Sequence, residues 1–196
     1  WATGDTYLAA VGQGYVLATP LQVVHSISTI ANDGKLMKLS LISKVEAADG
    51  TITQQFEPAV LWDITKDPKI AVYDGSIPTG ELKTVQPWVI QLAKKGMEMV
   101  TQIGGTAAIE FEGDTNKVAG KTGTAEYCDD FALANHLCGI GIGGWPAHAW
   151  FVGYAPYDDP EIVVVAFAYN GKEGSTLAAP IVRKVIESYF GLKAAD

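Results

Sequence analysis

The sequence is poor in cysteine and in positive charge, and it has no long hydrophobic run. Two cysteines among 196 residues are too few for a disulfide scaffold. Fourteen Lys and Arg residues against 22 Asp and Glu residues give a formal net charge of −8. Nucleic acid binding requires a basic surface, so we expect no nucleic acid partner. The longest apolar stretches, such as residues 162–169, have the length of a strand and are too short to span a bilayer.

The composition is that of a globular protein. Hydrophobic residues make up 48% of the chain and charged residues 18%, which suffices for a core and excludes disorder, collagen and coiled coils. The chain begins at Trp1, without a methionine and without a signal-like apolar segment. We therefore expect a fragment of a longer protein.

Capping residues mark the start of a helix near residue 20. Thr19 and Gln22 have the spacing of a capping box, and Pro20 suits the first helical position. Apolar and small residues follow at helical spacing, which predicts a helix over about 20–33. Gly34 can adopt the left-handed conformation that ends such a helix.

Helical spacing of apolar residues predicts two further helices. One covers about 87–103 and is ended by a pair of glycines. The other begins near Leu177 and ends before Gly191. Pro180 is expected to bend or delay the first turn of this closing helix.

Strands are predicted mainly in the last third of the chain. Residues 117–125, 148–154 and 162–169 have strand-like patterns, and the turn at 155–160 joins the last two as an antiparallel hairpin. Helices followed by antiparallel strands and a closing helix predict helices packed on an antiparallel sheet in one domain. This is an α+β arrangement within the broad α/β class.

Three other segments have weaker patterns. A small hairpin is expected around the turn at residues 49–51. Residues 56–86 contain prolines and glycines without a sustained period, which predicts irregular connecting structure. The glycine-rich residues 139–144 lack the strand-then-helix context of a phosphate site, so we expect a hairpin tip there.

Residues 118–126 are the most informative segment for function. A lysine, two threonines and flanking glycines place an ammonium, two hydroxyls and a closely approachable backbone on one short strand: Lys121, Thr122 and Thr124. Such a strand edge can bind an extended peptide by strand addition, with these side chains directed toward an anionic group. A surface strand with polar residues on its solvent side is the alternative interpretation.

Four segments resemble a known protein family. Lys121-Thr122-Gly123 resembles the third motif of the penicillin-binding proteins and serine β-lactamases. Residues 12–22, 30–34 and 151–156 resemble segments of class B penicillin-binding proteins, in the same order around that motif. Residues 12–17 are most similar to the penicillin-binding protein 2 type, which acts in elongation, and the division-type homologue is a close second. The resemblance implies part of the fold that serine β-lactamases share with penicillin-binding transpeptidases.

The nucleophile of that family is missing from this sequence. None of its seven serines has the Ser-x-x-Lys or Ser-x-Asn spacing of the family's other two motifs. The resemblance therefore implies that residues 1–196 are the C-terminal part of a single transpeptidase domain, whose N-terminal part carries the serine. We expect the fragment to be inactive alone.

The resemblance also implies roles for four residues. Lys121 is expected to add positive potential and to join the hydrogen-bond network of the second motif. Thr122 and Thr124 are expected to bind the substrate carboxylate, and Gly123 to let the strand approach the ligand. The backbone N–H of Thr124 is expected to be one oxyanion-hole donor, while the absent serine supplies the other. The expected catalytic residues are thus Lys121 and Thr124.

The activity implied is that of a peptidoglycan D,D-transpeptidase that cross-links cell-wall stem peptides and is acylated by β-lactams. The implied partners are these ligands, the missing N-terminal part and the cell-wall elongation machinery, and no cofactor is implied. The expected location is outside the cytoplasmic membrane, with an anchoring N-terminal helix that this chain lacks. The alternatives are a serine β-lactamase, and a β-lactam sensor or peptide-binding module without catalysis.

The segment after the motif contains both cysteines and two histidines, namely Cys128, Cys138, His136 and His148. A disulfide between the cysteines would close a short loop in an oxidising compartment. Free thiols, or a metal site with two thiolates and a histidine, are the alternatives. The spacing matches no metal site that we can identify, so we expect no metal.

Overall fold

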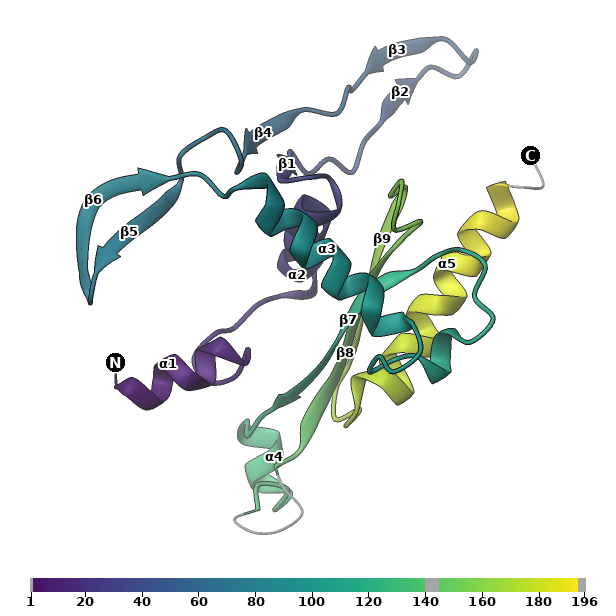
Figure 1. Ribbon diagram of the computed structural model, residues 1–196. Coiled ribbons are helices and arrows are strands. Elements are labelled where there is room, and N and C mark those ends of the chain that lie inside the picture. Colours follow the sequence, from purple (N-terminus) through teal and green to yellow (C-terminus); the bar gives the residue numbers. More distant parts are fainter. Residues whose placement is uncertain (1, 140–144, 194–196) are drawn as a thin grey trace. The chain divides into compact units, whose positions relative to one another are not determined.

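The computed structural model describes residues 2–139 and 145–193 (Figure 1). It has two compact units: one joins the described residues up to Ile27 with those from Lys94 onward, and the other is Ser28–Ala93. Helices and antiparallel strands are both present, as the sequence predicts. The expectation of a single domain stays a prediction, and the hairpin tip expected at 139–144 lies, after Gly139, outside the described residues.

A three-stranded antiparallel sheet forms the centre of the first unit. Its strands are β7 (Ala119–Glu126), β8 (Ala147–Ala155) and β9 (Ile162–Ala168), in the order β7-β8-β9. The three predicted strands and the predicted hairpin of the last two are confirmed. Most residues of the central strand β8 are buried, whereas β7 lies at an edge of the described sheet.

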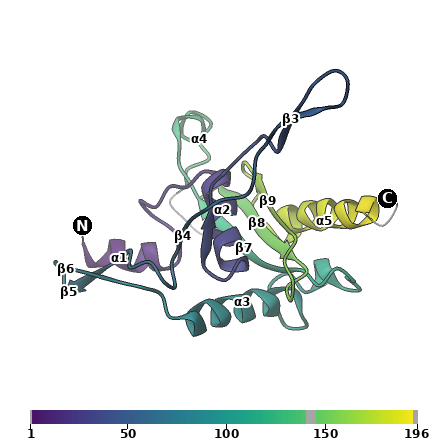
Figure 2. The same ribbon diagram turned by 90° about the horizontal axis from the view of Figure 1, so that it is seen from above.

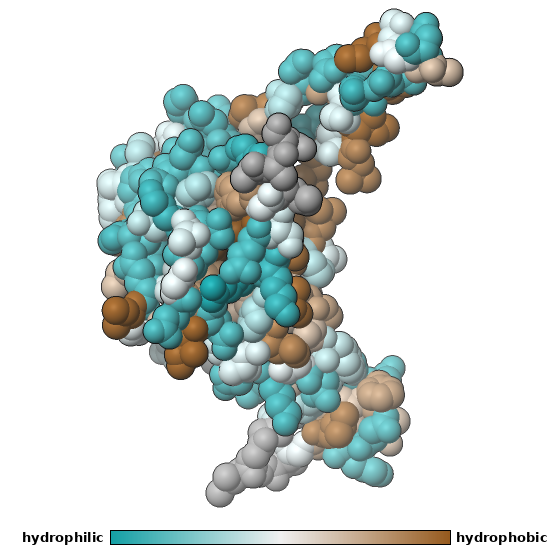
Figure 3. Space-filling view, turned by 90° about the vertical axis from the view of Figure 1, so that its right-hand side faces the viewer, coloured by the Kyte–Doolittle hydropathy of each residue, from teal (hydrophilic) through white to brown (hydrophobic). Residues whose placement is uncertain are grey.

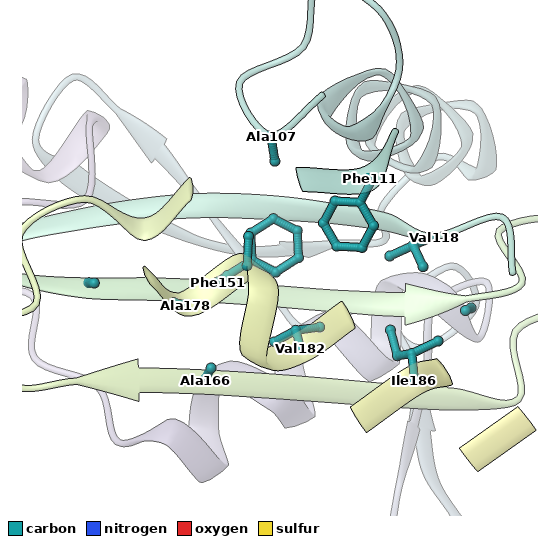
Figure 4. Packing of buried hydrophobic residues seen from close by; sticks show 11 residues of the cluster. Ala107, Phe111, Val118, Phe151, Ala166, Ala178, Val182 and Ile186 are labelled. Atoms are coloured by element: carbon teal, nitrogen blue, oxygen red, sulfur yellow. The ribbon is translucent and has the colours of Figure 1, made fainter. Parts of the chain in front are cut away.

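The hydrophobic core lies between this sheet and the closing helix. Figures 1 and 2 show α5 (Ala179–Lys193) running beside the strands, and its Val182 and Ile186 are fully buried. Phe111, from the short helix η1 (Ile109–Phe111), stacks on the buried ring of Phe151 with 5.4 Å between centroids (Figure 4). Apolar residues of α5 and β8 thus bury one face of the sheet.

The closing helix differs from its prediction at both ends. A π-helical segment, η2 (Gly174–Ala178), contains Leu177, and α5 itself begins just before Pro180. The helix also continues through Gly191, because a glycine lowers helix propensity without removing a backbone hydrogen bond. Seen from the right-hand side of Figure 1, the surface is largely hydrophilic, with scattered hydrophobic residues (Figure 3).

The predicted helix near residue 20 is confirmed as α2 (Pro20–Ala31). The Thr19 backbone N–H donates to Gln22 Oε1 at 2.8 Å, and the Gln22 N–H donates to Thr19 Oγ1 at 3.3 Å, so both halves of the capping box form. Gly34 has a φ of 93°, as its helix-ending role requires.

The second predicted helix is α3 (Pro87–Thr101), which ends just before the glycine pair at 104–105. In the first unit, Thr101 Oγ1 donates to the Val118 carbonyl at 2.6 Å and so ties the end of α3 to the start of β7. Two short helices, α1 (Thr3–Ala10) and α4 (Asp130–Ala134), were not predicted.

The second unit is built from three two-stranded antiparallel sheets. β2 (Lys44–Glu46) and β3 (Ile52–Gln55) form the predicted small hairpin. The other pairs are β1 (Lys35–Met37) with β4 (Val60–Asp63), and β5 (Ile70–Asp74) with β6 (Ile77–Lys83).

The prediction of irregular structure over residues 56–86 is wrong, because β4, β5 and β6 lie there. β5 and β6 are joined by the two-residue turn at Gly75 and Ser76, and Gly75 has a positive φ of 59°. Such a turn sets the pairing through the backbone. All residues of β6 are exposed, so the buried face that produces a readable hydrophobic alternation is missing.

Candidate active site

The predicted site residues lie together at the open edge of β7. Lys121, Thr122, Gly123 and Thr124 are consecutive on this strand, and all four line one cavity of about 580 Å³. We call it the β7 cavity. Residues 121–127 line it on the strand side, and residues 11–14 and 16–18, which follow α1, also contribute to its wall.

The alternation of hydrogen-bonded and non-hydrogen-bonded pairs between β7 and β8 decides which backbone groups of β7 face its open edge. The Tyr127 N–H donates to the Pro146 carbonyl at 3.0 Å, and the pairing with β8 is regular over the whole strand. Bonded and non-bonded pairs alternate along an antiparallel ladder. It follows that Thr122, Thr124 and Glu126 direct both their N–H and their carbonyl groups away from β8.

Two of the outward carbonyls are occupied by side chains. Lys121 Nζ donates to the Thr122 carbonyl at 2.7 Å, and Gln13 Nε2 donates to the Thr124 carbonyl at 2.8 Å. Within the described residues, no group accepts from the outward N–H of Thr122 or Thr124. The edge therefore offers hydrogen-bond donors to a ligand, beside a lysine ammonium.

The side chains on β7 have different surroundings. The Thr122 hydroxyl lies 3.2 Å from the hydroxyl of Thr106, a neighbour that the sequence did not reveal. Thr124 is exposed. A Cβ at position 123 would lie 3.0 Å from Trp150 Cβ, so the glycine lets β7 and β8 approach each other here. Its expected role toward a ligand stays a prediction.

Gln13 is the site residue that sequence reasoning missed. It lies in a turn after α1, where its N–H donates to the Leu8 carbonyl at 2.9 Å and where Gly12 and Gly14 have φ values of 78° and 79°. The Gly-Gln-Gly pattern at residues 12–14 belongs to a segment that carries the family resemblance, and it does not by itself indicate a contact with β7.

Aromatic side chains line the cavity beyond Thr124. The His148 ring stacks on Tyr127 with 3.8 Å between centroids, and Trp150 and Phe167 lie 4.6 Å apart. Burial lowers the pKa of His148, and the nearby Asp129 carboxylate opposes this shift only in part. The far part of the cavity is thus apolar and holds a neutral imidazole at pH 7.

The two cysteines form a disulfide, which is one of the three alternatives that the sequence left open. The bond closes the loop from Cys128 to Cys138 around α4. Asp129 caps this helix, since its carboxylate accepts from the Ala132 N–H at 2.8 Å. The loop that follows β7 is therefore closed covalently.

The two ends of this strand segment differ in charge. Lys121 is exposed and cationic, whereas the exposed carboxylate of Glu126 also lines the cavity and has no ion-pair partner among the described residues. Outward N–H groups, two hydroxyls and an ammonium suit a ligand that carries a carboxylate and a developing oxyanion.

Known proteins share this architecture. The family model described as "Penicillin binding protein transpeptidase domain" matches residues 1–187. The peptidoglycan D,D-transpeptidase MrdA of Haemophilus influenzae is 34% identical over 194 residues, which are 97% of this chain and 26% of that protein. The chain thus spans about a quarter of the length of this curated relative.

Solved structures agree with the sequence matches. PBPA from Mycobacterium tuberculosis superposes with a TM-score of 0.67 at 25% identity, over 93% of this chain and 35% of that one. The imipenem acyl-enzyme complex of the same protein superposes with a TM-score of 0.64 at 25% identity, over 93% of this chain and 33% of that one. Pseudomonas aeruginosa PBP2 in complex with WCK 5153 superposes with a TM-score of 0.66 at 29% identity, over 96% of this chain and 34% of that one. The expected fold and family are confirmed: the chain belongs to the penicillin binding protein transpeptidase domain family.

Proposed function

We propose that residues 1–196 are the C-terminal part of the transpeptidase domain of a serine-type peptidoglycan D,D-transpeptidase of the penicillin-binding protein 2 type. A preceding segment of the same domain supplies the nucleophilic serine. The absence of Ser-x-x-Lys from this sequence and its match to about a quarter of MrdA support this assignment.

The main observation that supports the proposal is that the backbone N–H of Thr124 points away from β8, toward the open edge. In the reaction, the serine oxygen bonds to the carbonyl carbon of a donor stem peptide, and the carbonyl oxygen becomes an oxyanion. The Thr124 N–H stabilises this oxyanion, together with the N–H of the serine itself. Loss of one such donor typically lowers the rate by about 10²–10³-fold.

The side chains of the motif and its glycine hold the donor peptide. The hydroxyls of Thr122 and Thr124 bind its terminal carboxylate, and Gly123 keeps the strand close to it. The ammonium of Lys121 adds positive potential and joins the hydrogen-bond network of the second motif, which lies in the preceding segment. The bond to the leaving amine then breaks, and this amine takes up a proton. The amine of a neighbouring stem peptide next attacks the acyl-enzyme, which forms the cross-link and restores the serine.

The same proposal places the domain outside the cytoplasmic membrane, anchored by a helix in another part of the protein and working with the cell-wall elongation machinery. The Cys128–Cys138 disulfide supports this location, because disulfides persist in oxidising compartments. In the described part of the chain, no helix is both long and apolar enough to cross a bilayer.

Covalent labelling with a fluorescent penicillin, read as a mass shift, tests the proposal. The full-length protein should gain one penicilloyl group, and the 196-residue chain alone should gain none. Stoichiometric acylation of the isolated chain would show that one of its own serines is the nucleophile, which contradicts the assignment.

A matched pair of lysine variants tests the site itself. Lys121→Ala in the full-length protein should slow acylation by at least about tenfold, because it removes the positive potential at the site and one member of its hydrogen-bond network. Lys184→Ala, on the exposed side of α5, should leave the rate unchanged. Equal rates for both variants would remove Lys121 from the mechanism.

The fate of the acyl-enzyme distinguishes the proposed transpeptidase from the two alternatives, a β-lactamase and a β-lactam sensor. A transpeptidase passes the acyl group of a peptide donor to an added amine, whereas a β-lactamase releases hydrolysed penicillin with rapid turnover. A sensor stays acylated and transfers nothing. Mass spectrometry of the products with and without an amine acceptor distinguishes the three.

A further inference from the structure

The π-helical segment η2 contacts the backbone of β7. Its first residue, Gly174, is buried. A Cβ at position 174 would lie 2.1 Å from the Trp150 carbonyl oxygen, and 2.6 and 2.9 Å from the carbonyl oxygen and the nitrogen of Gly123. The backbone of Gly174 therefore lies against the backbones of β7 and β8, at the glycine of the Lys-Thr-Gly motif.

This contact is made at the hydrogen bonds that hold the motif in the sheet. Gly123 is paired with Trp150, and Thr122 and Thr124 on either side of it direct their backbone groups outward. By the alternation of an antiparallel ladder, Gly123 and Trp150 are therefore a hydrogen-bonded pair. Three of the four backbone N and O atoms of this pair are the atoms nearest to a Cβ at position 174. The lack of a side chain at Gly174 thus lets η2 pack directly on this pair.

Of the elements that meet here, β7 is the one that would yield to a larger residue. The segment η2 is anchored, since Ala178 and Ala179 are fully buried and the Lys172 N–H donates to the Ala147 carbonyl at 2.9 Å. The central strand β8 has a neighbour on each side, whereas β7 pairs with β8 alone in the described sheet. The three nearest atoms belong to the backbone, so no rotation of a side chain relieves the contact. A Cβ at Gly174 would therefore displace β7.

We propose that Gly174 is a positioning residue, which sets the place of β7 and thereby the direction of the Thr124 N–H. This inference rests on the proposed function, since that N–H acts there on the oxyanion. A threonine hydroxyl can rotate toward a ligand, whereas the direction of a backbone N–H is fixed by its strand. Displacement of β7 should therefore affect the formation of the oxyanion more than the preceding binding of the ligand.

Hydrogen exchange in the wild-type full-length protein tests the support of β7, whether or not the protein is acylated. The N–H groups of Lys121, Gly123 and Ala125 all face β8, and Gly174 lies against Gly123. We expect the protection factor of the Gly123 amide to exceed those of the other two by at least about threefold. Protection that changes steadily from Lys121 to Ala125 would indicate fraying from one strand end and would overturn the inference.

The Gly174→Ala variant of the full-length protein tests the role in the reaction. Stopped-flow acylation by a fluorescent penicillin separates the affinity of the initial complex from the rate constant of acylation within it. We expect this rate constant to fall about 10- to 100-fold, because the oxyanion donor is displaced, and the affinity to change by no more than about threefold. A purely structural role would lower the fraction of folded protein and leave both constants of the folded molecules unchanged.

The matched control is Gly171→Ala. The three atoms nearest to a Cβ at position 171 belong to Ala149, Leu177 and Ala168, at 2.8 to 2.9 Å, and none of them belongs to β7. This variant crowds the same region without pushing on the motif. It should lower the thermal midpoint and leave the acylation rate constant within about twofold of wild type.

The outcomes keep the inference and the proposed function apart. If Gly174→Ala is acylated at the wild-type rate, the inference fails and the proposed function stands. Equal losses of rate in both glycine variants would show general destabilisation and would also overturn the inference. If Gly174→Ala does not fold, the exchange pattern of the wild-type protein decides. If the wild-type protein is not acylated, the proposed function fails, and the role of Gly174 in the reaction fails with it.

Discussion

The hydroxyl of Tyr169 donates to both carboxylate oxygens of Asp129, at 2.9 and 3.2 Å. Tyr169 directly follows β9, and Asp129 lies inside the loop that the disulfide closes. The same carboxylate accepts from the Ala132 N–H, and these hydrogen bonds, that of Ala132 first, lower the pKa of Asp129. The disulfide thus closes the loop on itself, and the charge-assisted contact from Tyr169 holds the loop to the end of β9.

Asp129→Ala should loosen this loop. The substitution leaves the Ala132 N–H without its cap, although Ala132 is fully buried. We expect several-fold faster hydrogen exchange of the Ala132 amide and faster reduction of the disulfide by dithiothreitol. Asp130→Ala removes a neighbouring exposed carboxylate that no capping bond uses and serves as the control. Identical rates for the two variants would show that the cap does not restrain the loop.

Joint replacement of Cys128 and Cys138 by serine should lower the free energy of unfolding. The cysteines are separated by 10 residues, and closing a loop of this length restricts the unfolded chain by up to about 3 kcal/mol. Urea unfolding of the full-length protein, with and without prior reduction, measures the loss. A reduced wild type that stays as stable as the oxidised one would contradict the prediction.

Phe151→Ala should be among the most destabilising substitutions in the chain. The ring is fully buried and stacks on Phe111, so its removal leaves a cavity that typically costs about 3–5 kcal/mol. Phe167→Ala, on the neighbouring strand, is the matched control, because that ring is 41% exposed and should cost clearly less. The denaturant midpoints of both variants measure the two losses of stability, and equal losses would contradict the location of the core.

Local signals account for the elements that the sequence predicted correctly. The capping box at Thr19 and Gln22 acts within one helical turn, so it marks the start of α2 without reference to the rest of the fold. The apolar runs of β8 and β9 can likewise be read from each strand alone. In contrast, β6 has no buried face, and its pairing depends on a turn among exposed residues.

The residues of the site likewise divide into those that the sequence predicts and those that depend on the fold. Lys121 and its neighbours form a contiguous motif, which sequence comparison can recognise. The contact from Gln13 to Thr124 depends on how a turn after α1 meets a strand more than a hundred residues later, and residue spacing carries no information about it. The same holds for Thr106, whose hydroxyl lies beside that of Thr122.

His148 should make the stability of the protein depend on pH below about 6.5. Burial holds its pKa below the ordinary value near 6.5, so the unfolded chain binds the proton more readily than the folded one. Its Nδ1 also accepts from the Asn170 N–H at 3.2 Å, and protonation of that nitrogen removes the bond. The contribution is fully present above the unfolded pKa and is lost as the pH falls through the lowered pKa of the folded state, whereas carboxylates such as Asp129 act below about pH 4. The thermal midpoint should therefore fall further between pH 7 and pH 5 for wild type than for His148→Phe, and equal decreases would contradict the prediction.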